Sequence, residues 1–274
     1  MDATAADNKN IKDVVREKYS RIATQNDSSG CGCGCGCSDS ENAVDYSVFS
    51  DSYEKIEGYN PDADLGLGCG LPTQFAMIKK GDTIVDLGSG AGNDCFVARA
   101  ESGEKGKVIG VDFSDEMLAK AHQNAAKLGF TNVDFVKGDI EELPLESSIA
   151  DVVVSNCVLN LVPDKQKAFS QVYRILKPGG HFSISDVVLV GELPQKLREE
   201  AEMYAGCVSG AIQKDEYIEV IRNAGFIDIK IQKDKIIEVP DYILLSYLKK
   251  DELADFKKSN VGIFSITVFG RKPE

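Results

Sequence analysis

Basic residues are in short supply in this sequence: 31 lysines and arginines stand against 44 aspartates and glutamates, a formal net charge of −13. Nucleic-acid phosphates and anionic lipid surfaces both attract basic proteins, so we expect neither nucleic acid nor a membrane as a partner. Long apolar runs are also missing, and the first residues, MDATAADNKNIKD, contain no apolar signal-peptide region. These absences predict a cytoplasmic protein.

Histidine is equally scarce, with only His122 and His181 in 274 residues. His122 falls in a predicted surface helix, and His181 follows the turn-forming sequence LKPGG. Neither is a persuasive general base. This scarcity favours a reaction whose nucleophile needs no proton removed.

Short apolar segments alternate with helical ones along most of the chain. Strands are expected at residues 82–88, 107–113, 132–139, 151–156 and 181–190, with two late strands at 226–234 and 261–272. Helices are expected at 93–100, 114–129, 164–177, 194–206, 214–224 and 242–258. Strands and helices at this spacing form parallel βαβ units. The sequence therefore predicts an α/β fold with a doubly wound, mostly parallel, Rossmann-like sheet of seven strands.

The N-terminal part differs in texture from the rest. Residues 11–24 have the apolar spacing of a helix, and residues 25–45 are rich in Ser, Gly, Cys and Asp, which is typical of a mobile loop. We therefore divide the chain into an N-terminal helix with a Cys/Gly-rich extension, 1–70, and an α/β domain, 71–274. Within that domain, residues 191–224 are expected to cover the substrate cleft.

A glycine-rich turn, VDLGSGAGND, ends the first predicted strand. Gly88, Gly90 and Gly92 allow a sharp turn and a close approach of the backbone to a ligand. The spacing misses the dinucleotide fingerprint, because Asn93 stands where G-x-G-x-x-G/A needs its last small residue. No Walker sequence is present either.

Acidic residues close the next two predicted strands. Asp112 ends the second, where a carboxylate can accept hydrogen bonds from both ribose hydroxyls, and Asp139 ends the third, within reach of an adenine amino group. Either residue alone could be a helix N-cap or a turn residue. Three such features at three successive strand ends favour a nucleoside site.

The set D-x-G-x-G-x-G, acidic strand end, G-D and LKPGG resembles the class I S-adenosylmethionine-dependent methyltransferases. The resemblance implies S-adenosylmethionine as cofactor. It assigns the methionine end to Asp86, Gly88, Gly90 and Gly92, the ribose to Asp112 and the adenine to Asp139, and it adds Asn156 to the cofactor site. It leaves the substrate open, because this fold methylates very different molecules.

Half of the eight cysteines, Cys31, Cys33, Cys35 and Cys37, alternate with glycine in the run CGCGCGC. In a cytoplasmic protein they are better explained as metal-binding, catalytic or structural thiols than as disulfides. Their spacing is tighter than the C-x₂₋₄-C of structural zinc sites. We favour a mobile tether for a thiophilic substrate, with a separate zinc or copper site, or a glycine-rich linker with incidental cysteines, as alternatives.

The other cysteines are spread along the α/β domain. Cys157 follows the fourth strand and Cys207 lies in the segment expected to cover the cleft, while Cys69 is flanked by glycines that leave its sulfur open. Cys95, in the first helix of the domain, is expected to be a small buried hydrophobe. Soft thiolates converging on a methyl donor suggest a soft substrate. Trivalent arsenic fits, because it binds three thiolates and keeps a lone pair that can attack a sulfonium methyl group.

The segments GLGCGLP, SNCVLNL and AGCVSGA together resemble the arsenite methyltransferase family. The resemblance implies that Cys69, Cys157 and Cys207 are the catalytic arsenic ligands, joined by one or more of Cys31, Cys33, Cys35 and Cys37. It also implies arsenite as a thiol conjugate for substrate, glutathione or thioredoxin as the cellular reductant, and a role in detoxification.

Two other functions stay open on the sequence. LKPGG and the late helices also occur in methyltransferases of quinones and other small molecules, where Cys157 and Cys207 would be core residues. A thiol-rich metalloid-binding protein on a degenerate scaffold is the second alternative. The intact Asp86, Gly88, Gly90 and Asp112 count against it.

Overall fold

The structure is a computed structural model that describes residues 3–25, 51–193, 208, 210–238, 241–245, 249, 253, 256–259 and 261–274. The four cysteines of CGCGCGC, the predicted helix at 194–206 and Cys207 lie outside the described residues, as does most of the predicted loop at 25–45.

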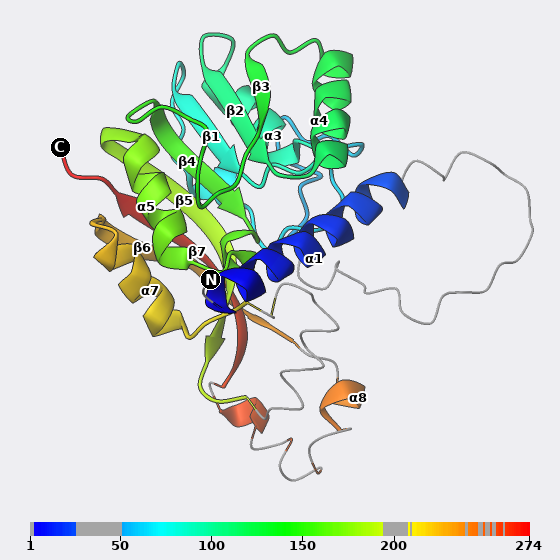
Figure 1. Cartoon of the computed structure of the whole chain (residues 1–274), viewed down its shortest axis with the longest axis vertical. Coiled ribbons are helices and arrows are strands. Elements are labelled where there is room, and N and C mark those ends of the chain that lie inside the picture. The colour runs from blue at the N-terminus through cyan, green and yellow to red at the C-terminus, as the bar shows by residue number, and fades with distance from the viewer. Residues whose placement is uncertain are drawn as a thin grey trace, which may run out of the picture.

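Seven strands form one sheet in the order β3-β2-β1-β4-β5-β7-β6 (Figure 1). They are β1 (Thr83–Leu87), β2 (Lys107–Asp112), β3 (Val133–Lys137), β4 (Ala150–Asn156), β5 (Leu176–Val190), β6 (Ile227–Ile237) and β7 (Gly262–Arg271). The first five are parallel, and β7 runs antiparallel to both of its neighbours. The predicted doubly wound, mostly parallel sheet is confirmed. Its strand order reverses between β1 and β4, which is where such sheets bind ligands, beyond the carboxyl ends of the strands.

The longer helices are α1 (Ala3–Gln25), α3 (Asn93–Ser102), α4 (Asp115–Leu128), α5 (Lys165–Ile175) and α7 (Lys214–Asn223). Short turns of helix are α2 (Pro72–Phe75), η3 (Leu159–Leu161) and α8 (Asp241–Leu244). The expected ends of α4 are confirmed. The Ser114 hydroxyl accepts a hydrogen bond from the Met117 N–H at 3.2 Å, and the helix stops at Gly129 with φ +69°.

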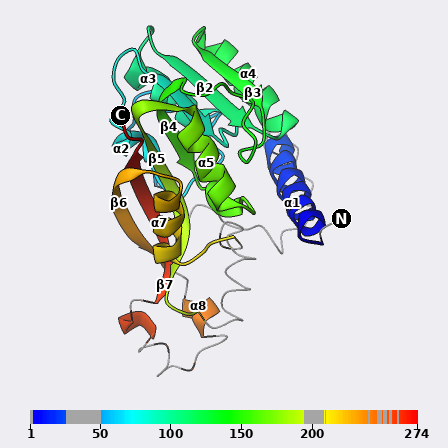
Figure 2. The same cartoon turned by 60° about the vertical axis from the view of Figure 1, so that its left-hand side comes forward.

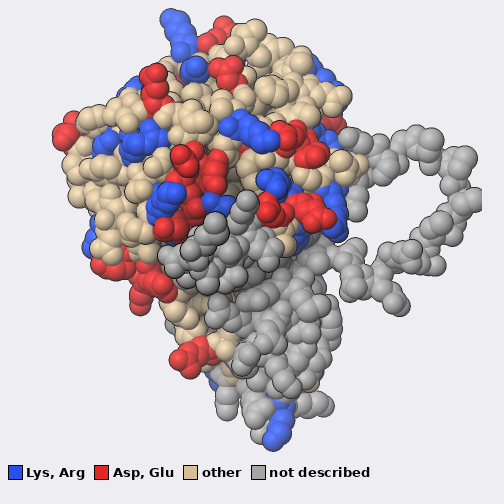
Figure 3. All heavy atoms as spheres, viewed as in Figure 1, with Lys and Arg blue, Asp and Glu red and all other residues tan. Residues whose placement is uncertain are grey.

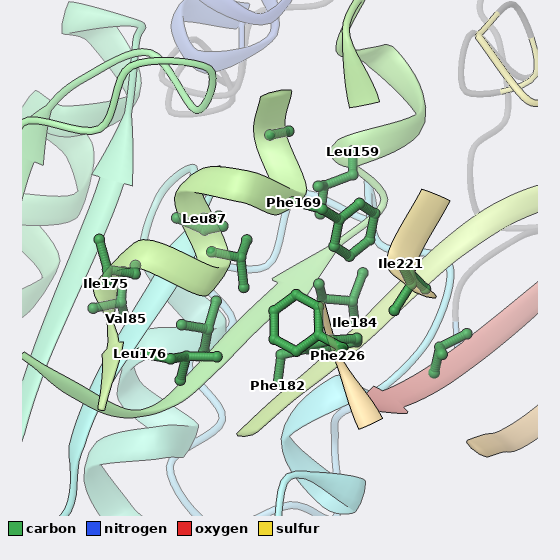
Figure 4. Close-up of a cluster of buried hydrophobic side chains, with 14 of the residues drawn as sticks. Val85, Leu87, Leu159, Phe169, Ile175, Leu176, Phe182, Ile184, Ile221 and Phe226 are labelled. Carbon is green, nitrogen blue, oxygen red and sulfur yellow. The ribbon is translucent and has the colours of Figure 1, made fainter. Parts of the chain in front are cut away.

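Alternating side chains along the strands pack into two separate hydrophobic cores, one on each face of the sheet. Ile84 of β1 packs toward α3 and α4, whereas Val85 and Leu87 pack on the opposite face, under α5 and α7. Figure 2 shows α5 and α7 lying over that second face. Figure 4 shows its aromatic centre, where the Phe182 ring lies 5.7 Å from Phe169 and 4.8 Å from Phe226, centroid to centroid. The central strands are thus buried on both faces, whereas the edge strand β6 is largely exposed, and the carboxyl ends of the central strands are left to form a site.

The structure corrects the sequence analysis at LKPGG. The predicted helix does end before Pro178, whose ring cannot continue it, but the chain enters β5 directly at Leu176 instead of making a turn. The ladder with β4 is shifted between Ala150 and Val152 to accommodate this start. The C-terminal segment pairs with it: the Lys272 N–H donates to the Gly180 carbonyl at 2.8 Å.

Helix α1 begins earlier than predicted and lies against α4, across the lower end of β3 (Figures 1 and 2). Its Ser20 hydroxyl is 3.1 Å from the Ser114 hydroxyl. The Lys120 ammonium of α4 donates to the Ala23 carbonyl at 2.9 Å. These contacts place α1 at the carboxyl ends of the strands, beside the cleft.

Acidic and basic side chains are interspersed over the face drawn in Figure 3. Among the helices that the structure describes, none combines the length and the apolar character needed to cross a bilayer.

The cap of α4 gives a test of this part of the fold. Ser114→Ala removes the acceptor for the Met117 N–H, and we expect it to lower the free energy of unfolding by about 1 kcal/mol. Urea denaturation followed by circular dichroism measures the change. Ser170→Ala is the matched control, because that hydroxyl is exposed and donates to the Lys167 carbonyl within its own helix. Equal effects in the two variants would contradict a capping role.

Candidate active site

The glycine-rich turn joins β1 to α3 with three residues of positive φ: Gly88 at +71°, Gly90 at +52° and Gly92 at +99°. Two of them are closely packed. A Cβ on Gly88 would lie 2.4 Å from Val158, and one on Gly92 would lie 2.8 Å from Phe96. Around Gly90 nothing comes nearer than 4.0 Å. The turn is therefore closely packed at Gly88 and Gly92 and open at Gly90, its tip, where a ligand can approach the backbone.

A cleft opens over this turn, and most of the predicted site residues line it: Asp86, Gly88, Gly90, Asp112, Asp139, Asn156 and Cys157. Gly92, predicted to line the methionine end of the cofactor, is not among the lining residues, and Phe96 and Phe135 pack against it instead. Cys69 is likewise absent from the cleft wall.

Asp112 ties two elements of the site together. One carboxylate oxygen accepts the Gly90 N–H and the other accepts the Ser114 N–H, both at 2.9 Å. Burial raises the pKa of Asp112, and the backbone donors oppose that rise. The carboxylate thus fixes the tip of the glycine turn relative to α4 while it faces the cleft.

Two further carboxylates, Asp86 and Asp94, lie in the same wall. Burial raises the pKa of Asp86 well above its usual range, and the nearby charges of Asp94 and Asp112 add to the rise. Burial also raises the pKa of Asp94 to about 6, although hydrogen bonds from Asn156 and Tyr53 oppose it. Three carboxylates around one cleft favour a cationic ligand, because its charge offsets both their mutual repulsion and their burial.

Asp139 closes the cleft at the other end. It is 44% exposed, and the Lys12 ammonium of α1 binds its carboxylate at 2.6 Å and also pairs with Glu141. Val15 and Tyr19 of the same helix line the cleft as well. The residue predicted to contact adenine therefore already has a lysine as partner, and α1 forms part of the wall.

The two described thiols outside α3 lie in one buried cluster. Cys157 is 2% exposed and Cys69 is 1% exposed. Val208, which follows Cys207 in the chain, is fully buried in the same cluster. The structure therefore brings Cys69 and Cys157 together, while the third predicted ligand, Cys207, lies outside the described residues.

The backbone of both thiol residues is fixed by hydrogen bonds. The Cys157 N–H donates to the Ser185 carbonyl at 2.8 Å, with φ of Cys157 at +60°. The Cys69 N–H donates to Asn156 Oδ1 at 3.0 Å, and its carbonyl accepts the Ser265 hydroxyl. Within the described ranges, no group of three or more His, Cys, Asp or Glu side chains is arranged to hold a metal ion.

A buried acid–phenol pair lies close to these thiols. The Tyr217 hydroxyl donates to Asp186 at 2.9 Å, and both side chains are fully buried. Burial raises the pKa of Asp186 to about 7. Burial and Asp186 raise the pKa of Tyr217, and charge on Cys69 or Cys157 raises it further, which places the phenol near both thiols.

The remaining candidates lie away from the cleft. The His122 ring stacks edge-on against Phe135 at 5.4 Å, and His181, predicted in a turn, lies within β5 with Nε2 2.6 Å from the Ala76 carbonyl oxygen. Cys95 is fully buried as expected, and its thiol donates to Asp86 at 3.2 Å.

Sequence reasoning missed Asp94, Tyr53, Tyr19 and Lys12. The first of these had a usable signal, since an acid directly after the glycine turn and Asn93 is placed to enter the same cleft as Asp86. Asp94 is equally well explained as an acidic residue in the first turn of a helix, where its charge interacts favourably with the helix dipole. The others belong to no motif.

Comparisons with known proteins agree with this fold and site. Residues 78–225 match a family model described as a methyltransferase domain. The crystal structure of an arsenic(III) S-adenosylmethionine methyltransferase from Chlamydomonas reinhardtii aligns with a TM-score of 0.63 and 36% sequence identity, covering 75% of this chain and 68% of that one. The protein is therefore a member of the methyltransferase class.

Two curated relatives indicate the family within the methyltransferase class. The arsenite methyltransferase of Halobacterium salinarum is 42% identical over 85% of this chain and 61% of its own length, and the human one is 36% identical over 63% and 48%. The chain belongs to the arsenite S-adenosylmethionine methyltransferase family. S-adenosylmethionine is the cofactor of that family. The chain spans about half to three fifths of the length of these curated relatives.

Removal of the Asp112 carboxylate tests the nucleoside end of the cleft. Asp112→Ala removes the acceptor for the Gly90 N–H and the acceptor expected for the ligand hydroxyls, and a hydrogen bond to a charged group is worth about 1.5–3 kcal/mol. We expect S-adenosylhomocysteine affinity, measured by calorimetry, to fall about tenfold or more. Asp115→Ala, at an exposed position three residues on, is the control. Unchanged affinity in folded Asp112→Ala would remove this residue from the site.

The raised pKa of Asp94 predicts a pH dependence. A ligand carrying an ammonium group binds the ionised form, so below pH 6 a proton must leave Asp94 before binding. Between pH 7.5 and 5 we expect S-adenosylhomocysteine affinity to fall about tenfold. The titratable side chains that interact with the Asp94 carboxyl are Tyr53, Asp64 and Asp86. Asp94→Asn should remove the step near pH 6, and a step that persists in that variant would assign the titration to another residue.

Proposed function

We propose that this protein transfers methyl groups from S-adenosylmethionine to trivalent arsenic and so detoxifies arsenite in the cytoplasm. The observation that carries the proposal is the pair of buried thiols, Cys69 and Cys157, which share one cluster, with Cys157 in the wall of an acidic cleft and Cys69 behind that wall. Such a pair beside a cation-binding cleft suits a thiophilic substrate presented to a positively charged methyl donor.

The residues of the cleft fit the cofactor in charge and in shape. Asp86 and Asp94 would offer two carboxylates to the ammonium and sulfonium charges, Asp112 would hold the ribose, and Asp139 would contact the adenine. The open tip at Gly90 leaves room for the backbone approach. When bound, the cofactor supplies an electrophilic methyl group.

The substrate chemistry follows from the thiols. Trivalent arsenic, delivered as a thiol conjugate, exchanges its ligands for Cys69, Cys157 and Cys207, and its lone pair attacks the methyl group. No proton has to be removed from the nucleophile, and neither histidine lines the described cleft. Glutathione or thioredoxin serves as the reductant between cycles. Cys31, Cys33, Cys35 and Cys37 act as a shared tether that passes arsenite to the deeper thiols.

The direct test is release of S-adenosylhomocysteine with and without arsenite and a thiol. Arsenite-dependent release supports the proposal. S-adenosylhomocysteine release that does not depend on arsenite would favour a different small-molecule substrate. Arsenite binding without release of S-adenosylhomocysteine would favour a metalloid-binding protein.

Cys157→Ser tests the thiol in the cleft wall. A hydroxyl is a hard, protonated donor that cannot replace a thiolate on arsenic. We expect the variant to lose most arsenite-dependent turnover and to keep its S-adenosylhomocysteine affinity. Cys95→Ser is the matched control, because the serine hydroxyl can still donate to Asp86, and it should retain the arsenite dependence. Near-normal turnover in Cys157→Ser would indicate another substrate.

Cys69→Ser is expected to impair arsenite methylation more than methylation of a monomethylated trivalent arsenical. One valence of the methylated arsenic is already filled, so it needs two protein sulfurs, which Cys157 and Cys207 supply. Product analysis by chromatography with arsenic detection compares the two substrates. An equal loss on both would show that Cys69 serves both steps alike.

A further inference from the structure

One side-chain amide joins the acidic wall of the cleft to the loop that carries Cys69. Asn156 Oδ1 accepts the N–H of Cys69 at 3.0 Å and that of Gly70 at 3.3 Å. At the other end, Nδ2 donates to the Tyr53 hydroxyl oxygen at 2.7 Å and to Asp94 at 3.2 Å. Nδ2 also donates to the Gly70 carbonyl at 2.8 Å. Donors surround the oxygen and acceptors surround the nitrogen, so the amide has one orientation.

The loop that carries Cys69 packs closely against this amide. A Cβ on Gly68 would lie 2.6 Å from Asn156 Nδ2, so even a methyl group there would displace it. The Tyr53 hydroxyl, which accepts from Asn156, donates in turn to both oxygens of Asp94 at 2.9 Å. The Cys69 carbonyl is bound by Ser265 on the far side. The position of Cys69 therefore depends directly on the position of one planar group.

We propose that Asn156 is a positioning residue that couples occupancy of the cofactor site at Asp94 to the placement of the Cys69 thiol. The proposal rests on the function proposed above, in which Cys69 binds the substrate. It adds a link between two sites to the direct cofactor contact expected for Asn156, which lines the cleft.

The coupling has a simple physical origin. A ligand ammonium group beside Asp94 favours its ionised form, and hydrogen bonds to a carboxylate are shorter and stronger than those to a neutral acid. The Nδ2 and Tyr53 donors are then held more tightly. Because the amide is planar, fixing Nδ2 also fixes Oδ1 and the two N–H groups it binds. The effect is reciprocal: a ligand that fixes Cys69 must strengthen cofactor binding by the same factor.

The alkylation rate of Cys69 measures this coupling without arsenic. Iodoacetamide labels the thiol, and peptide mass spectrometry separates Cys69 from the other cysteines. In the wild type, saturating S-adenosylhomocysteine should slow the labelling about fivefold or more, the lower range of typical site couplings. In Asn156→Ala, Cys69 should react faster without the ligand, and the ligand should change its rate less than about twofold.

The matched control is Asn132→Ala. Its amide also binds backbone carbonyls, those of Gly103 and Gly106, but at the opposite end of the strands. It should keep the full protection of Cys69. Calorimetry fixes the ligand concentration needed to saturate each variant.

Two results would overturn the proposal. Protection that persists in saturated Asn156→Ala would mean that the ligand merely covers the thiol, and an unprotected wild type would mean that no coupling exists. If Asn156→Ala does not fold, Tyr53→Phe replaces it, because it removes the hydroxyl that bonds both Asn156 and Asp94 and leaves only the direct 3.2 Å hydrogen bond between them. We expect it to lose at least half of the protection, and unchanged protection would contradict the link. Arsenite-dependent turnover, measured separately, tests the proposed function.

Discussion

Three carboxylates facing one cleft, Asp86 and Asp112 buried and Asp94 half-buried, are the constraint around which the site is built. Asp86, Asp94 and Asp112 come from the end of β1, the start of α3 and the end of β2, and a parallel sheet brings these points together at one edge. Carboxylates so placed are costly to bury unless donors or a cation satisfy them. Nearby hydrogen-bond donors offset part of the cost of burying these carboxylates. The part that is not offset makes the cleft attract positive charge. The charge preference of the cleft is thus a consequence of the fold.

The thiol cluster depends on the same edge of the sheet. Cys157 directly follows β4, and the loop with Cys69 is held against it by the Asn156 side chain of β4 and the Ser265 side chain of β7. The topology therefore sets an acidic wall beside a soft, apolar, sulfur-containing one. In the proposed function, a cationic methyl donor and a thiophilic acceptor meet at that boundary.

Local sequence patterns predicted most of the fold but only part of the site. The strands, the glycine turn and the Ser114 cap are encoded in short segments, because periodicity and turn chemistry act over a few residues. LKPGG was the local failure: a helix breaker was predicted to make a turn, yet the pairing of Leu176 with Ala150 extends the strand. That outcome depends on the sheet, which no single segment specifies.

The site contacts that escaped prediction join residues far apart in the chain. Asn156 meets Asp94 across 62 residues and Tyr53 across 103, and Lys12 meets Asp139 across 127. Spacing and motif carry no information at such separations. The convergence of Cys69 and Cys157, by contrast, was expected from the place of each thiol relative to the strands, and the family resemblance implied it as well.

The backbone of Cys157 shows what the site costs the protein. Its φ of +60° lies in the left-handed region, where a residue with a Cβ is strained by about 1–3 kcal/mol and glycine is not. Stability and chemistry therefore make opposite demands on a single position. A selection for heat resistance alone would favour glycine there, and each stabilised descendant would lack a sulfur at the edge of the cleft.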